Sequence, residues 1–128
     1  RGKWIPDSPA IRQSVLDRLQ NWYSPVSLSN PTQGIQEAIY SFHDNNKQIA
    51  IWVLGDDFGK KGQFGDITVD SVCKMVSRMN ESDRFGNRLV RIHGIAFPTQ
   101  GATEPEKYVH LLRKLSEQNG GTFVALPL

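Results

Sequence analysis

An apolar run followed at once by two aspartates is the feature that most constrains the fold of this chain. The run is Ile49-Ala50-Ile51-Trp52-Val53-Leu54, and Gly55, Asp56 and Asp57 come directly after it. A continuous run of this length, rich in β-branched and aromatic residues, predicts a strand buried on both faces at the centre of a parallel sheet. Ligands of such sheets bind beyond the carboxyl ends of the strands, so Asp56 and Asp57 are the first candidates for a functional site.

Helix and strand signals alternate along the rest of the chain. Helices are predicted at residues 9–23, from Ser29 or Asn30 before Pro31 to the turn at 43–46, at 68–79, and from a cap at Thr103 to the stop at 119–121. Strands are predicted at residues 48–54, 89–97 and 122–126. This order predicts an α/β protein with a three-layer Rossmann-like fold, in which the strands pair in parallel in chain order with helices on both faces of the sheet.

Length and composition exclude several classes of protein. The 128 residues fit a single domain with a core of its own, and the single cysteine, Cys73, excludes an internal disulfide. A net charge of +2, without a long run of Lys or Arg, argues against a nucleic-acid-binding surface. No apolar segment has the length needed to insert into a membrane. The chain begins with Arg1 rather than Met, so we expect it to be part of a longer protein, and no feature indicates a cellular compartment.

Several motifs resemble the C-terminal portion of a von Willebrand factor A (VWA) domain of the bacterial type. They are the strand Arg91-Ile92-His93-Gly94-Ile95-Ala96-Phe97 and the later segment Leu111-Leu112-Arg113-Lys114-Leu115-Ser116-Glu117-Gln118-Asn119-Gly120-Gly121-Thr122-Phe123. Residues 3–9 and 29–35 resemble segments of bacterial members, and Leu54-Gly55-Asp56-Asp57 resembles the family's Leu-(Ser/Thr)-Asp-Gly. The resemblance covers essentially the whole chain, but only the later portion of the family's domain.

The resemblance also implies a metal site, because VWA domains bind a divalent cation at a metal-ion-dependent adhesion site built from three loops. It places the aspartate of the third loop on Asp56 and the threonine of the second loop on Ser29, with Thr32 as the other register. Asp57 replaces the family's glycine, Gly55 replaces its hydroxyl residue, and the Asp-x-Ser-x-Ser motif of the first loop is absent from this chain. We therefore expect an incomplete site with weak or no Mg²⁺ binding and no required cofactor, Mg²⁺ being bound only in the intact parent domain.

The residues themselves leave two interpretations of this site open. Asp56 and Asp57 offer the oxygen ligands that Mg²⁺ prefers, with Ser29 as a third, or they lie in a solvated loop where Asp56 accepts hydrogen bonds from backbone amides. Ser29 before a proline is also a common helix cap. The three histidines lack chelate spacing, and Cys73 on an apolar helix stripe is expected to act as a small hydrophobe. No nucleophile, base and orienting group come together, so we do not expect an enzyme.

We interpret the chain as a VWA-like protein-interaction module with a degenerate metal site, whose partner is another protein. The alternative is a small Rossmann-like hydrolase or phosphotransfer domain that uses Asp56 with Mg²⁺. The resemblance implies that the strand beside residues 48–54 is missing, so that strand is expected to have an unprotected edge. We expect a homodimer through this edge, or residues 1–5 folded back across it.

Overall fold

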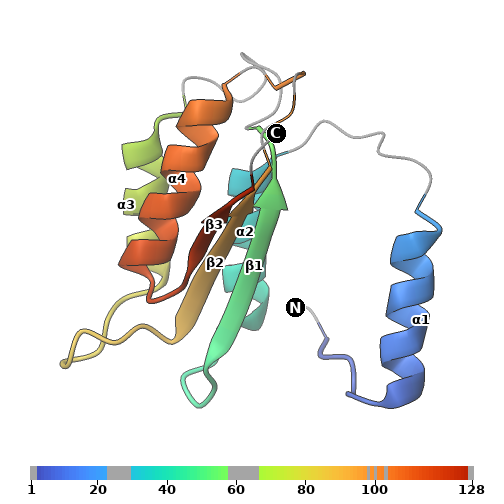
Figure 1. Cartoon of the computed structure of the whole chain (residues 1–128). Helices are drawn as coiled ribbons and strands as arrows, with labels where there is room; N and C mark the ends of the chain where they lie inside the picture. Colours follow the sequence, from blue (N-terminus) through green and yellow to red (C-terminus); the bar gives the residue numbers. More distant parts are fainter. Residues whose placement is uncertain are drawn as a thin grey trace.

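The computed structural model describes residues 3–22, 30–57, 67–97, 99, 101–102 and 104–126. Its elements are α1 (Pro9–Gln20), α2 (Pro31–Phe42), β1 (Ile49–Gly55), α3 (Val69–Met79), β2 (Val90–Ala96), α4 (Pro105–Gln118) and β3 (Phe123–Ala125), as Figure 1 shows. The strands form one parallel sheet in the order β1-β2-β3. The predicted α/β class and the parallel pairing in chain order are confirmed.

The boundaries of the elements differ from the predictions by a few residues. The predicted helix at 9–23 ends at Gln20, and the predicted strands at 89–97 and 122–126 are each one residue shorter at both ends. The N-cap of α4 is Glu104 rather than the predicted Thr103, which lies outside the described residues. Differences of one to three residues are usual at the ends of helices and strands, where the regular hydrogen bonding frays.

Three helices pack against one face of the sheet. β1 contributes Ile49, Ile51 and Val53 to this face, because alternate side chains of a strand point the same way. The core between the sheet and α2, α3 and α4 consists of Ile35, Ile39, Ile49, Val53, Val72, Cys73, Val76, Val90, Ile92, Ala96, Tyr108, Leu111, Leu112 and Leu115. The apolar positions of these helices recur at helical spacing, which is why each helix presents one continuous stripe to the sheet.

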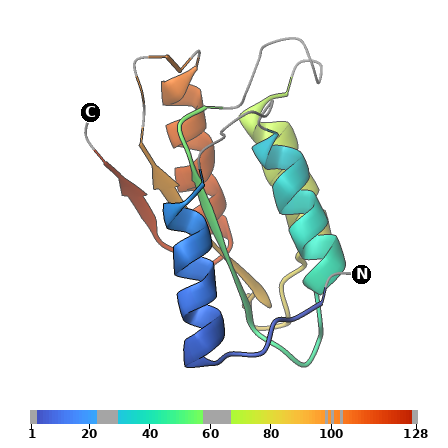
Figure 2. The same ribbon diagram turned by 90° about the vertical axis from the view of Figure 1, so that its right-hand side faces the viewer.

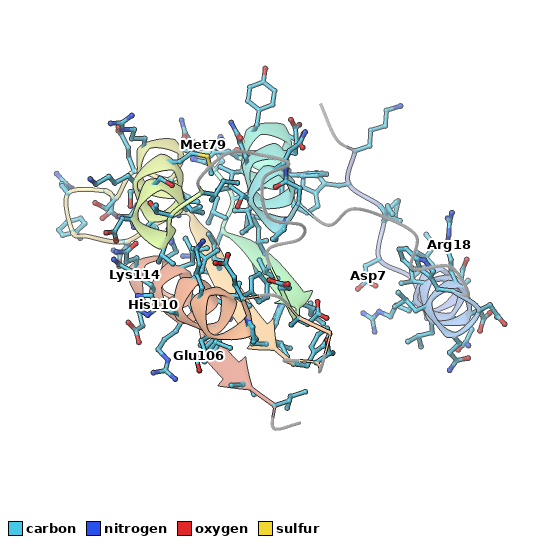
Figure 3. All side chains as sticks on the ribbon, turned by 90° about the horizontal axis from the view of Figure 1, so that it is seen from above. Asp7, Arg18, Met79, Glu106, His110 and Lys114 are labelled. Atoms are coloured by element: carbon cyan, nitrogen blue, oxygen red, sulfur yellow. The ribbon has the colours of Figure 1, made fainter. Side chains whose placement is uncertain are left out.

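The helix α1 lies on the opposite side of the sheet without packing on it. Ser8 caps the helix by accepting a hydrogen bond from the backbone N–H of Ile11 at 3.3 Å, with Pro9 in its first turn. Figure 2 shows α1 in front of the sheet, and Figure 3 shows α1, with Arg18, and α4, with His110, on different sides of it. No residue of α1 is buried, and its apolar side chains Val15, Leu16 and Leu19 are exposed.

A buried pair of asparagines joins the ends of two helices to the sheet. Asn80 ends α3, Asn119 ends α4, and both side chains are 0% exposed. The Asn80 side-chain amide donates to the Val90 carbonyl at 2.7 Å and to the Asn119 Oδ1 at 2.8 Å, and its Oδ1 accepts from the Val90 N–H at 3.1 Å. The pair therefore fixes where β2 begins relative to both helices. In the sequence, Asn80 lies between the predicted helix at 68–79 and the predicted strand at 89–97, and no local pattern predicts this role for it.

Replacing Asn80 by alanine is expected to lower the free energy of unfolding by about 2–4 kcal/mol, because it leaves several buried polar groups of Val90 and Asn119 without partners. Urea denaturation measures the change. Asn45→Ala, at an exposed turn position, is the matched control and should change stability by less than about 0.5 kcal/mol. Equal stabilities of the two variants would contradict the structural role given to Asn80.

Candidate functional site

The carboxyl ends of the strands form the first candidate site. All three strands are parallel, so their carboxyl ends lie at one edge of the sheet, where Asp56 and Asp57 follow β1. Figure 1 shows that α2, α3 and α4 also begin at this end. The positive ends of the three helix dipoles therefore face the region of the two carboxylates.

Asp56 connects the end of β1 to the segment that follows β2. Its Oδ2 accepts a hydrogen bond from the hydroxyl of Thr99 at 2.8 Å. Both residues are close to the carboxyl ends of neighbouring strands, since the backbone N–H of Phe97 donates to the Gly55 carbonyl at 3.0 Å. Asp56 therefore has a local structural role, as a hydrogen-bond acceptor for the loop between β2 and α4.

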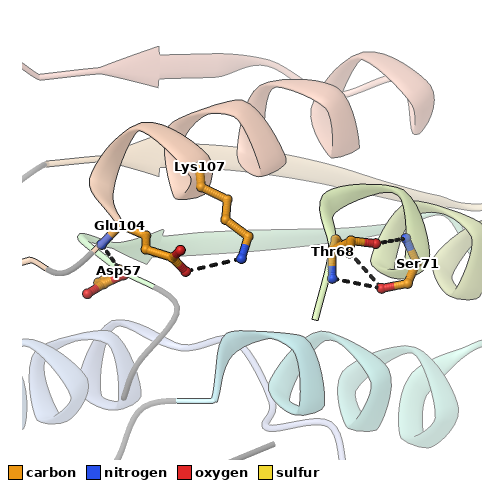
Figure 4. Close-up of polar contacts among 5 residues, drawn as sticks. All are labelled: Asp57, Thr68, Ser71, Glu104 and Lys107. Atoms are coloured by element: carbon orange, nitrogen blue, oxygen red, sulfur yellow. Dashed lines mark hydrogen bonds and ion pairs between the residues drawn. The ribbon is translucent and has the colours of Figure 1, made fainter. Parts of the chain in front are cut away.

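Asp57 fixes the beginning of α4. Its Oδ1 accepts a hydrogen bond from the backbone N–H of Glu104 at 3.3 Å (Figure 4). Glu104 is the N-cap of α4, and its own side chain makes no capping hydrogen bond but lies 3.1 Å from the Nζ of Lys107. A carboxylate at a helix N-terminus is stabilised by the unpaired N–H groups there. Asp57, which follows β1, thus provides a negative charge that stabilises the N-terminus of α4.

Tyr108 explains why glycine precedes the two aspartates. This residue lies in the first turns of α4, is 1% exposed, and points its hydroxyl at Gly55. A Cβ atom at position 55 would lie 2.6 Å from that hydroxyl, which is closer than real contacts allow. The VWA-like pattern has serine or threonine at this position. The buried tyrosine takes the space which such a side chain would need.

The surroundings of Tyr108 also shift its ionisation. Burial of the hydroxyl, together with the nearby negative charges of Asp56 and Asp57, raises the pKa of Tyr108 to about 12. Tyr108 therefore stays neutral over the physiological range. It acts as a packing residue beneath the two carboxylates and does not supply a proton at neutral pH.

The described residues do not fit a divalent-metal site at this edge. Asp56 and Asp57 each use an oxygen for a hydrogen bond within the protein, and no group of three His, Cys, Asp or Glu side chains in the described ranges has a geometry that holds a metal ion. Mg²⁺ requires several oxygen ligands in octahedral geometry. Ser29, the third predicted ligand, lies outside the described residues, whereas Thr32 is the second residue of α2.

The second candidate site is the uncovered face of the sheet, which we call the open sheet face. It consists of Ala50, Trp52, Leu54, Arg91, His93, Ile95 and Val124, which the register places on the side away from α2, α3 and α4. Arg91 is its one charged side chain, at the end opposite Leu54 and Val124. Trp52 is 58% exposed, Leu54 59% and Val124 48%. A cluster of large apolar side chains left in water is typical of a binding surface.

Trp52 is held in place on this face by His93. Their rings stack with centroids 4.3 Å apart and an interplanar angle of 14°. The His93 Nδ1 accepts a hydrogen bond from the backbone N–H of Thr122 at 3.1 Å and lies 2.9 Å from the hydroxyl of the same residue. His93 therefore orients the Trp52 ring, and Thr122, the residue before β3, orients His93. The open sheet face therefore carries an exposed but ordered aromatic side chain.

The sequence prediction that the strand at 48–54 is buried on both faces is wrong for the side that carries Trp52. The sequence of this run does not show that one face is buried and the other exposed, because both faces carry large hydrophobic side chains. Trp4 and Trp22 are exposed to a similar degree, at 57% and 67%. In the sequence, His93 is only one of three histidines without chelate spacing. Its position opposite Trp52 follows from the register of β1 and β2, which the sequence alone does not determine.

A polar cavity at the other end of the sheet does not form a convincing site. It has a volume of about 490 Å³ and lies between the amino ends of the strands and the end of α4. Two arginines, Arg88 and Arg91, are balanced there by Asp83 and Glu117. The C-terminal end of α4 adds partial negative charge, so no single class of ligand is favoured.

Cys73, as expected, is buried in α3, and burial raises the pKa of its thiol.

Comparisons with family models, curated proteins and solved structures gave no match to this chain. The resemblance to VWA domains therefore rests on the sequence motifs. Among the described residues, no helix combines the length and hydrophobicity that a membrane span needs.

Gly55→Ser is expected to lower the free energy of unfolding by about 1–3 kcal/mol, because the added side chain collides with the Tyr108 hydroxyl. In a Tyr108→Phe background the same substitution should be less costly, which a double-mutant cycle by urea denaturation measures. Gly101→Ser is the control, since a Cβ there meets nothing within 4 Å. An identical cost of Gly55→Ser in both backgrounds would contradict the proposed contact.

Alkaline pH is expected to destabilise the protein through Tyr108. Its pKa in the folded protein, about 12, is above the ordinary value of 10.0, so the folded state favours the neutral hydroxyl. This contribution is complete below pH 10 and is lost as the pH rises from 10 towards 12. Urea denaturation at about pH 9 and about pH 11 should show a larger loss of stability in the wild type than in Tyr108→Phe. Equal losses of stability in the wild type and in Tyr108→Phe would contradict this prediction.

Proposed function

We propose that this chain is a VWA-like protein-interaction module that binds another protein through its open sheet face. The observation that carries the proposal is the exposed Trp52, stacked on His93 at the centre of a predominantly apolar sheet surface. Tryptophan is enriched among residues that dominate binding energy at protein interfaces. A side chain already fixed by stacking loses little conformational freedom when a partner binds, which favours affinity.

The network at the carboxyl ends of the strands supports a binding role rather than a catalytic one. Asp56 and Asp57 hold Thr99 and Glu104, and Tyr108 is neutral at physiological pH. These contacts stabilise the loop between β2 and α4 and the start of that helix. The proposed binding does not depend on a metal ion, which agrees with the incomplete metal-site pattern of the sequence.

Affinity capture with the intact chain as bait, in extracts of its own source cells, tests this function. A partner captured by the wild type is expected to lose affinity by at least about 2 kcal/mol, or about thirtyfold, with Trp52→Ser. Tyr40→Ser is the matched control, because Tyr40 is an equally exposed aromatic residue, 69% exposed, on α2 away from this face. Both variants should match the wild type in secondary structure and stability.

Two results would contradict the proposal. One is a partner that binds the wild type and the Trp52→Ser variant equally well. The other is a partner that loses affinity equally with Trp52→Ser and Tyr40→Ser, because such a loss would not be specific to the open sheet face.

A further inference from the structure

We propose that the outer edge of β1 pairs in antiparallel orientation with β1 of a second copy of this chain, joining two three-stranded sheets into one continuous sheet. The inference rests on the proposed interaction function and names a second copy as a partner at the margin of the same open sheet face. Four features of the structure support it: the direction of the backbone groups, the composition of β1, its symmetry about Trp52, and the position of the N-terminal segment.

The hydrogen bonds of β1 show which backbone groups are available. The N–H of Ile49 donates to the Leu89 carbonyl at 2.9 Å, and the carbonyl of Gly55 accepts from the N–H of Phe97 at 3.0 Å. In a strand with parallel pairing, alternate residues turn both backbone groups to the same side. The odd-numbered residues of β1 therefore face β2, and the N–H and C=O groups of Ala50, Trp52 and Leu54 face the outer edge.

This edge lacks the usual protection against pairing. Natural edge strands are kept single by short length, proline, charged side chains or bulges. β1 has seven residues, Ile-Ala-Ile-Trp-Val-Leu-Gly, without charge or proline. The other edge strand of the sheet, β3, has only three residues. Of the two edges, β1 is the one suited to recruit another strand.

A second copy of β1 fits this edge because the strand is complementary to itself around Trp52. A two-fold axis beside Trp52 places this residue opposite its own copy and Ala50 opposite Leu54. Those three residues carry all the outward backbone groups of β1, so one symmetric arrangement pairs every one of them. The small side chain of Ala50 then faces the larger Leu54, and the two tryptophans become neighbours on the open sheet face. No charged side chain on β1 opposes the pairing.

The described part of the N-terminal segment does not pair with this edge. The sequence expectation that residues 1–5 fold back across the edge is wrong for the described residues 3–5, which form no strand. Trp4 instead packs on Phe42 of α2, with ring centroids 4.9 Å apart, and the Nζ of Lys47 lies 5.8 Å from the Trp4 ring centroid. Among the described residues, β2 is the only strand paired with β1.

Sedimentation and amide exchange of the intact chain at several concentrations test the dimer. We expect a monomer–dimer equilibrium in which the amides of Ala50, Trp52 and Leu54 exchange more slowly as the concentration rises. The amides of Ile51 and Val53, which face β2, should be protected at every concentration. This alternation distinguishes pairing through the edge from association through any other surface.

Two alanine-to-proline variants provide the matched comparison. Ala50→Pro removes an outward N–H of β1 and should abolish the dimer, since proline is tolerated at an edge but blocks pairing there. Ala125→Pro makes the same change at an outward position of β3 and should leave the dimer intact. The protected amides of Ile51 and Val53 verify that Ala50→Pro remains folded.

A chain that stays monomeric while the amides of Ala50, Trp52 and Leu54 exchange freely would overturn the inference. So would a dimer that survives Ala50→Pro. Either result would leave the proposed function standing if a different protein still binds in a Trp52-dependent way. Conversely, an edge dimer without any such partner would support the inference while the broader interaction function fails.

Discussion

A parallel sheet on which the described helices pack against only one face is the constraint on which the rest of this structure depends. Parallel sheets usually have helices packed on both faces, because their strands are apolar on both sides. Here α2, α3 and α4 bury Ile49 and Val53, whereas Trp52 and Leu54, on alternate positions of the same strand, remain in water. The helix α1 stands on the uncovered side but buries none of its residues. The apolar surface left exposed on this face is the basis of the interaction function that we propose.

The carboxyl ends of the strands are closed by contacts within the protein. Asp56 holds Thr99, Asp57 holds the start of α4, and Tyr108 fills the space above Gly55. These contacts depend on one another. The absence of a side chain at Gly55 leaves room for the Tyr108 hydroxyl, and Tyr108 lies close to the carboxylates of Asp56 and Asp57. Asp56 and Asp57, which resemble part of a metal site, thus hold Thr99 and the start of α4 in place.

The sequence predicted the elements and their parallel order well, because helix caps and apolar periodicity are local signals. Ser8, Asn30 and Thr68 each cap the helix that follows them. It also predicted Asp56 and Asp57 as neighbours beyond a strand end. The sequence did not predict the exposure of Trp52, because the identity of an apolar residue does not show whether another helix or strand covers it. The roles of Asn80 and Tyr108 depend on partners 39 and 53 residues away along the chain, Asn119 and Gly55.

The most direct measurement of the central claim is the solvent accessibility of Trp52 in the dilute, folded chain. A variant with Trp4→Phe and Trp22→Phe keeps Trp52 as its single tryptophan. The account predicts that acrylamide quenches the fluorescence of this residue nearly as strongly as it does in the urea-unfolded protein. Weak quenching together with a blue-shifted emission in the folded monomer would show that the second face of the sheet is already covered, and would contradict the account.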